Sequence, residues 1–234
     1  MRKAVPSKVF GQNGKVRILI VDDHPIFRRG LIQIIEHDAR LSVCGETETL
    51  AAALDAIKSQ QPDLIIVDIG LRGTNGIELV KEIKATRPAL PALVLSMHDE
   101  PLYAERALRA GARGYVIKQE ASDHVMTAIH RVLEGDFFIS PSLGDEILQK
   151  FLQDGNGCQE SPLGNLSDRE LEVLELIGRG LGTRQIAQRL NISVKTIESH
   201  RAHIKKKVGI KTAPALVHFA VVWADQGKVI HKTD

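Results

Sequence analysis

Three aspartates in this sequence stand where they could bind a metal ion and accept a phosphoryl group. Asp22 and Asp23 follow the apolar run Ile18–Val21, and Asp68 follows a second run, Leu64–Val67. Such short aliphatic runs predict strands buried on both faces of a parallel sheet, whose carboxyl ends are where ligands bind. Clustered carboxylates would repel one another without a cation, and oxygen ligands suit Mg²⁺. The aspartates therefore indicate a site where a phosphoryl group meets Mg²⁺.

Alternating strand and helix patterns from residue 16 to about residue 137 must position these aspartates. Five segments are strand-like: Val16–Val21, Leu41–Gly45, Leu64–Asp68, Ala92–Ser96 and Gly114–Ile117. The segments that follow them carry apolar residues at i, i+3 and i+4, which predicts five amphipathic helices. Five such units favour an α/β domain with a doubly wound parallel sheet of five strands in flavodoxin-like order.

Two more polar side chains are expected at the same sheet edge. Ser96 ends the fourth strand and Lys118 follows the fifth. Asp68 is the candidate nucleophile, because carboxylates can accept phosphoryl groups, and Asp22 and Asp23 would hold the metal with it. A plainer interpretation is that the aspartate pair caps the next helix and that Lys118 is a solvated surface lysine. Five suitable residues on four strand ends favour the phosphoryl site.

Charge is unevenly distributed along the chain. Its 234 residues carry 31 Lys and Arg and 29 Asp and Glu, a formal net charge of +2. Residues 164–234 hold 12 basic and 7 acidic residues, a balance of +5, which leaves 19 and 22, or −3, for residues 1–163. A basic C-terminal part joined to an acidic N-terminal part raises the expectation of nucleic acid binding.

Other features bear on the compartment. No apolar stretch approaches the ~20 residues of a membrane span, and the basic N-terminal tail lacks the apolar core of a secretory signal. Cys44 and Cys158 show neither metal-ligand spacing nor a disulfide framework. A cytoplasmic protein without a membrane partner is expected.

The chain is expected to have four parts. Residues 1–15 form a basic tail and residues 16–137 the α/β domain. Residues 138–163, punctuated by proline and glycine around one amphipathic stretch (Asp145–Leu152), form a linker. Residues 164–234 form an all-α domain of four helices.

The C-terminal part has the pattern of a helix-turn-helix. Ser167–Glu170 is a capping box that starts the first helix. The predicted elements then follow in order: a second helix Arg184–Leu190 capped by Thr183, a turn Asn191–Ser193, a third helix Val194–Lys207, and a fourth from Pro214 to about Gln226. Several short helices around a tight turn are typical of this motif, whose second core helix enters the DNA major groove.

The third helix has two distinct faces. Its apolar residues Val194, Ile197, Ile204 and Val208 should pack on the other helices. Small and basic side chains (Lys195, Ser199, Ala202 and Lys206) lie opposite, flanked by Glu198, His203 and Lys205. Such a face suits groove reading and phosphate contact, although a merely solvated helix would also be polar.

Residues 16–137 resemble the receiver domain of response regulators, through Val21–Pro25, Asp68, Ser96 and Lys118. The resemblance implies that a sensor histidine kinase phosphorylates Asp68 and that Mg²⁺ is held by Asp22, Asp23, Asp68 and the backbone carbonyl of Gly70. Tyr115 stands where the family keeps a switch aromatic that acts with the hydroxyl of Ser96; an ordinary strand aromatic explains it equally well. Arg72 replaces a common proline, which puts kinase docking and phosphoryl lifetime in question.

Residues 164–227 resemble a LuxR-type domain over Leu166–Leu174, Gln185–Ala187, Ile192–Arg201 and Lys207–Ile210. Together the two resemblances imply the NarL/FixJ family of transcription regulators. The expected DNA contacts are Lys195, Thr196, Glu198, Ser199, His203 and Lys206. The fourth helix is expected to dimerise through Leu216, Phe219, Ala220 and Trp223, and core packing explains Trp223 equally well.

The sequence thus predicts a two-component response regulator, which is not an enzyme in its own right. It would be phosphorylated on Asp68, form a homodimer and bind double-stranded promoter DNA with inverted half-sites, with RNA polymerase as a further candidate partner. One alternative is a phosphorylation-independent LuxR-type transcription factor with a degenerate receiver. A phosphotransferase or phosphatase would need a second acid where Ile69 and Gly70 stand. A ligand-sensing LuxR-type receptor would need pocket aromatics, yet the sole tryptophan, Trp223, lies in the C-terminal part.

Overall fold

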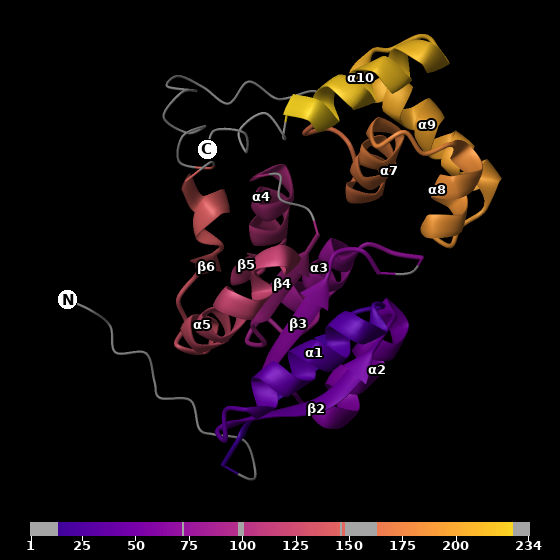
Figure 1. The fold of residues 1–234 in the computed structure, drawn as a ribbon. Coiled ribbons are helices and arrows are strands. Elements are labelled where there is room, and N and C mark those ends of the chain that lie inside the picture. The colour runs from indigo at the N-terminus through magenta and orange to yellow at the C-terminus, as the bar shows by residue number, and fades with distance from the viewer. Residues whose placement is uncertain (1–13, 72, 98–100, 146, 148–162, 227–234) are drawn as a thin grey trace. The chain divides into compact units, whose positions relative to one another are not determined.

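The computed structural model describes residues 14–71, 73–97, 101–145, 147 and 163–226, in two compact units, Met1–Gln149 and Lys150–Asp234 (Figure 1). Arg72, Cys158 and residues 1–13 of the predicted basic tail lie outside the described residues. So does most of the predicted helix Asp145–Leu152, although residues 141–145 are helical.

The N-terminal unit is a parallel sheet with helices on its faces, as predicted, in the order β2-β1-β3-β4-β5-β6. Its strands are β1 (Val16–Val21), β2 (Leu41–Thr47), β3 (Leu64–Asp68), β4 (Ala92–Ser96), β5 (Gly114–Ile117) and β6 (Phe138–Ile139). Its helices are α1 (Pro25–Glu36), α2 (Leu50–Gln60), α3 (Gly76–Thr86), α4 (Pro101–Ala110) and α5 (Ala121–Leu133), with a 3₁₀ turn at Lys118–Glu120. The flavodoxin-like order of the first five strands is confirmed.

The expected number of strands, five, is wrong, because β6 forms a sixth. It pairs parallel with β5, with Phe138 opposite Gly114 and Ile139 opposite Tyr115. The strand lies within residues 138–163, which were predicted to be a linker. Two residues are too few to show the alternation by which a strand is recognised in a sequence. The linker prediction is therefore corrected at its start, since these residues belong to the sheet.

Buried aliphatic side chains hold the strands of the sheet in place. Every residue of β3, β4 and β5 is buried, and β1 is buried from Ile18 onward. Leu31 and Ile35 of α1 and Val125 and Ile129 of α5 pack on one of its faces. Fully burying each such side chain contributes about 1.5–3 kcal/mol. The carboxyl ends of the strands are thus held on a well-packed core.

The strand register brings the predicted site residues to one edge. Val21 lies opposite Val67, so Asp22 and Asp68 each follow a paired residue. Asp68 lies opposite Leu95, and Ser96 lies opposite Ile117. Ser96 and Lys118 therefore come next along the edge.

The C-terminal unit contains α7 (Asp168–Gly178), α8 (Thr183–Arg189), α9 (Val194–Val208) and α10 (Ala213–Gln226). The predicted capping box is present: the Ser167 hydroxyl accepts from the Glu170 amide at 3.2 Å, and Glu170 accepts from the Ser167 amide at 2.7 Å. Asn191, in the turn before α9, has a left-handed φ of 52°. No helix among the described residues is both long and apolar enough to cross a membrane.

One predicted helix start is corrected. Thr183 was expected to cap the second helix, but it is the first residue of α8 and Gly182 is the N-cap. The Gln185 side chain accepts from the Gly182 amide at 2.8 Å. The N3 side chain thus satisfies the amide of the N-cap residue itself, although the glycine at the cap has no hydroxyl to accept from the helix.

Candidate functional site

Lys118 lies between two of the predicted carboxylates. Its Nζ is 2.6 Å from Oδ2 of Asp68 and 2.8 Å from Oδ2 of Asp22. All three side chains are buried, and the ammonium also lies 4.6 Å from the centre of the Phe27 ring. Buried charges persist when they are paired, as here. The plainer interpretation of Lys118 as a solvated surface lysine is therefore wrong.

The aspartate pair does not cap α1. His24 is the N-cap of that helix, and its side chain makes no cap hydrogen bond. Asp22 instead accepts from the His24 amide at 2.7 Å. The pair is thus available to the cluster at the sheet edge.

His24 is the residue of this cluster that sequence reasoning missed. Its Nδ1 lies 2.9 Å from Asp23, 3.3 Å from Asp22 and 3.3 Å from Asp68. The hydrogen bond to Asp68 raises the pKa of His24, against the opposing effect of burial. The only signal in the sequence was its position directly after the acidic pair. The imidazole Nδ1 thus lies among three carboxylates at the sheet edge.

The cluster could hold a metal ion. Asp22, Asp23, His24 and Asp68 each offer one ligand atom, and these four atoms lie within 4.8 Å of one another. Burial alone would raise the pKa of Asp68, but hydrogen bonds from His24 and Lys118 lower it, so the carboxylate is charged. The Gly70 amide also donates to Asp68 Oδ1 at 3.2 Å. The three carboxylates of the cluster, Asp22, Asp23 and Asp68, fit a cation such as Mg²⁺, which prefers oxygen ligands.

The two predicted switch residues are both buried. Ser96 is fully buried and follows Leu95, the register partner of Asp68. Tyr115 is also fully buried, in β5 between β4 and β6. The structure places Ser96 at the edge that carries Asp68, and Tyr115 three residues before Lys118. Their switching role stays a prediction.

Arg28 of α1 holds the backbone beneath the acidic pair. Its guanidinium donates to the carbonyl of Asp22 at 2.5 Å and pairs with Glu46 of β2 and with Glu48 at 3.0 Å. Its side chain is only 12% exposed. Arg28 thus joins α1 to β2 and to the turn that follows β1. Sequence reasoning did not find this residue, because its partners are 18 and 20 positions away.

Gly76, the first residue of α3, touches the backbone of β3 at Asp68. A Cβ atom here would overlap the carbonyl of Asp68, and the Gly76 amide donates to Ile69 at 2.8 Å. We expect Gly76→Ala to lower the free energy of unfolding by about 1–3 kcal/mol, as overpacking does. Urea unfolding of the full chain measures it.

Gly30 offers a matched control for that substitution. It lies inside α1 with nothing within 4 Å of an added Cβ. Gly30→Ala should therefore stabilise the protein by about 0.5–1 kcal/mol. Equal effects of the two substitutions would contradict the proposed crowding at Asp68.

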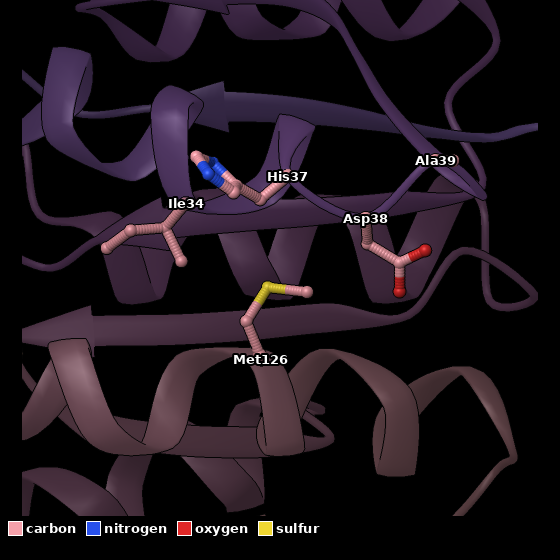
Figure 2. A pocket seen from close by; sticks show the side chains of 5 residues that line it. All are labelled: Ile34, His37, Asp38, Ala39 and Met126. Atoms are coloured by element: carbon pink, nitrogen blue, oxygen red, sulfur yellow. The ribbon is translucent and has the colours of Figure 1, made fainter.

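A separate pocket of about 590 Å³ lies between α1 and α5, lined by Ile34, His37, Asp38, Ala39 and Met126 (Figure 2). Asp38 pairs there with Arg40 at 2.7 Å and with His130 at 3.2 Å. Three of the lining residues, His37, Asp38 and Ala39, follow the C-terminal end of α1 and precede β2, so the pocket lies at the sheet edge opposite the carboxylates. The pocket is not part of the carboxylate cluster.

Helix α9 exposes every residue predicted to contact DNA. Lys195, Thr196, Glu198, Ser199, His203 and Lys206 are all exposed, whereas Ile197 and Ile204 are fully buried. Ser193 caps the helix by accepting from the Thr196 amide at 3.0 Å. Among residues 163–226, neither Lys195 nor Lys206 forms an ion pair, so both ammonium groups face solvent.

Three expected packing roles need correction. Val194 was predicted to be buried but is 39% exposed. It is the first residue of α9, and helical side chains lean toward the N-terminus, so it extends past its neighbours. Leu216 and Ala220 were predicted dimer contacts, yet both are fully buried where α10 packs on α7. They are core residues and offer no surface to a second subunit.

The exposed apolar surface of α10 is formed by other residues. Val217, Val221 and Val222 are 37–42% exposed, and Phe219 and Trp223 are partly buried. Two of the four predicted dimer residues, Phe219 and Trp223, thus keep some accessible surface. Their role in dimerisation stays a prediction.

Glu170 joins the start of α7 to the end of α9. Lys207 Nζ lies 2.6 Å from its Oε2, and His203 Nδ1 lies 3.8 Å from its Oε1. Burial would raise the pKa of Glu170, but hydrogen bonds from Lys207 and Ser167 lower it overall. A carboxyl with a depressed folded pKa stabilises above its unfolded value, about 4.3 for Glu, and this stabilisation is lost as pH falls through the folded value.

We therefore expect the unfolding free energy of wild type to decrease relative to that of Glu170→Gln below about pH 4.3. The glutamine keeps an acceptor for the Ser167 amide and lacks the charge. Urea unfolding followed by fluorescence of Trp223, the only tryptophan, measures the C-terminal unit. Parallel pH profiles would show that the ion pair adds no stability.

Comparison with known proteins defines the class. Residues 18–130 match the response regulator receiver domain, and residues 164–220 match bacterial regulatory proteins of the luxR family. The oxygen regulatory protein NreC of Staphylococcus carnosus is 33% identical over 211 residues, which are 88% of this chain and 97% of NreC. The chain therefore belongs to the family of response regulators that join a receiver domain to a LuxR-type DNA-binding domain.

Solved structures agree. RcsB of Salmonella typhimurium is 28% identical, with a TM-score of 0.63 over 89% of this chain and 98% of that one. A two-component response regulator RcsB–DNA complex is 28% identical, with a TM-score of 0.55 over 90% and 98% of the two chains. The prediction of a receiver joined to a LuxR-type helix-turn-helix is confirmed, and the chain is a two-component response regulator and transcription regulator.

Proposed function

We propose that Asp68 accepts a phosphoryl group from a sensor histidine kinase. The contact that carries this proposal is the buried ammonium of Lys118 between Asp68 and Asp22. An Asp68 oxygen would attack the phosphorus of a phosphohistidine, and the bond from phosphorus to the histidine nitrogen would break. The product is an aspartyl phosphate on Asp68 and a neutral histidine on the kinase.

Asp22, Asp23, Asp68 and the Gly70 carbonyl would hold Mg²⁺. When bound, the ion supplies positive charge for the oxygens of the transferring phosphoryl group. Lys118 would add a fixed cation beside Asp68. Ser96, next along the edge, is proposed to contact the phosphoryl group and, with Tyr115, to report its presence.

The C-terminal unit is proposed to bind double-stranded promoter DNA through α9. Lys195 and Lys206 would contact phosphates, while Thr196, Glu198, Ser199 and His203 would meet base edges or the backbone. The solved complex of the related response regulator RcsB with DNA supports the proposal that this chain binds DNA. A phosphorylated homodimer would bind two inverted half-sites, and RNA polymerase would be a further partner. The protein would encounter both the kinase and the DNA in the cytoplasm.

The test compares the DNA affinity of the full chain before and after phosphorylation. A binding duplex is first selected from random sequences. We expect acetyl phosphate with Mg²⁺ to raise the affinity of wild type and to leave Asp68→Asn unchanged, because a ligand shifts an equilibrium only through its differential affinity for the two states. Equal affinity of wild type in both conditions would instead support a phosphorylation-independent transcription factor.

A further inference from the structure

The segment after β6 reaches back to the strand end that carries Lys118. Ser140 is fully buried, and its hydroxyl accepts a hydrogen bond from the Ile117 amide at 3.2 Å. The Ser140 amide donates to the carbonyl of Tyr115 at 3.0 Å. Ile117 is the last residue of β5 and directly precedes Lys118. Figure 1 shows β6 beside β5 in the sheet.

This hydroxyl replaces a missing partner in the sheet. The last backbone hydrogen bond from this segment to β5 is the one from the Ser140 amide to Tyr115. The Ser140 carbonyl accepts from Leu143 and Gly144 instead, so the Ile117 amide meets the Ser140 hydroxyl in place of a backbone carbonyl. A buried amide without an acceptor costs about 1–3 kcal/mol. Ser140 supplies this acceptor, so β5 stays hydrogen-bonded to the following segment as far as Ile117, the residue before Lys118.

A second bond holds the chain on the other side of Lys118. The Ser142 hydroxyl donates to Oε1 of Glu120 at 2.7 Å, and Glu120 ends the 3₁₀ turn that Lys118 begins. The amides of Leu143 and Gly144 donate to the Ser140 carbonyl at 3.1 Å and 3.0 Å. Ser140 and Ser142, two residues apart, thus hold the chain on the two sides of Lys118, at Ile117 and at Glu120.

We propose that Ser140 is a positioning residue for Lys118. It holds the backbone of Ile117 so that the ammonium lies between Asp68 and Asp22. The segment that contains it, residues 138–145, is also where the chain leaves the receiver toward the DNA-binding unit. The residues that flank Lys118 are therefore hydrogen-bonded to the first residues of the connection between the two units. This inference rests on the proposed phosphorylation of Asp68.

The experiment uses the full chain with Ser140→Ala and Ser140→Thr, and Ser59→Ala as control. Ser59 also makes a side-chain bond to the backbone, at 2.9 Å, but on exposed α2. Hydrogen exchange of the Ile117 amide and the rate of acetyl phosphate-dependent phosphorylation are measured at saturating Mg²⁺. We expect Ser140→Ala to speed exchange and to slow phosphorylation about three- to tenfold, as loss of one hydrogen bond does. Ser140→Thr should restore both, and Ser59→Ala should change neither.

A double-mutant cycle separates positioning from general destabilisation. If Ser140 acts through Lys118, Ser140→Ala should not slow phosphorylation further in a Lys118→Ala background. The inference is overturned if Ser140→Ala slows phosphorylation by the same factor in both backgrounds. It is also overturned if Ser140→Ala is phosphorylated at the wild-type rate. Should Ser140→Ala not fold, Ser140→Cys, whose sulfur is a weaker acceptor, replaces it in the same cycle with the same two outcomes. Failure of wild type to be phosphorylated would overturn the proposed function instead.

Discussion

Asp68→Ala should gain no phosphoryl group from acetyl phosphate, whereas wild type should gain one. The methyl side chain has no nucleophilic oxygen, and Asp68 is the carboxylate that ends β3 and pairs with Lys118 at 2.6 Å. Mass spectrometry of the intact chain measures the result. Chelating Mg²⁺ with EDTA should prevent the gain in wild type, since the cluster would lose its added positive charge.

Asp55→Ala is the matched control, because Asp55 is an exposed aspartate of α2 whose carboxylate is 84% exposed. It should be phosphorylated as wild type is. A phosphorylated Asp68→Ala chain would show that a different residue, such as Asp22 or Asp23, is the acceptor. Phosphorylation of wild type in EDTA would contradict the metal requirement alone.

Replacing both Lys195 and Lys206 by alanine should weaken DNA binding about 10- to 100-fold at low salt. Each lysine that contacts a phosphate releases a counterion, so the slope of log affinity against log salt should fall by about one for each. Affinity for a selected duplex is measured over a series of salt concentrations. The loss should be similar on specific and random duplexes, because phosphate contacts carry no sequence information.

Lys207→Ala controls for the charge change on the same helix. Lys207 is adjacent to Lys206 but pairs with Glu170 at 2.6 Å. Its loss should lower stability and leave the salt slope nearly unchanged. Substituting Glu198 or Ser199 should alter which bases are preferred instead. An unchanged slope and affinity in the double lysine variant would show that this face of α9 does not meet the DNA backbone.

Most of the fold was predictable because its signals are local. Four strands, β1, β3, β4 and β5, have the predicted bounds, since each is an apolar run closed by a polar residue at the sheet edge. Strand order then follows from the alternation with helices. Asp22, Asp68 and Lys118 could be placed together for the same reason, because parallel strands end at one edge.

The features that were missed depend on contacts between distant residues. Ser140 meets Ile117 across 23 positions, and Arg28 meets Glu48 across 20. The position of His24 among three carboxylates depends on how the β1–α1 turn bends. The burial of Ala220 depends on the close approach of Gly178, at which a Cβ would overlap the Ala220 carbonyl. A helix as apolar as α10 does not reveal in its sequence which face is covered.

The sixth strand determines where the receiver can be cut. An isolated receiver that ends at residue 137, the boundary that the sequence suggested, would lose the strand that covers β5. It would expose the carbonyl of Tyr115 and the amide of Ile117 along a bare edge, which invites pairing with other chains. A fragment that continues to residue 145 keeps Ser140 and Ser142. Phosphoryl lifetime or self-association measured on a shorter fragment would therefore be the property of a sheet that lacks its sixth strand.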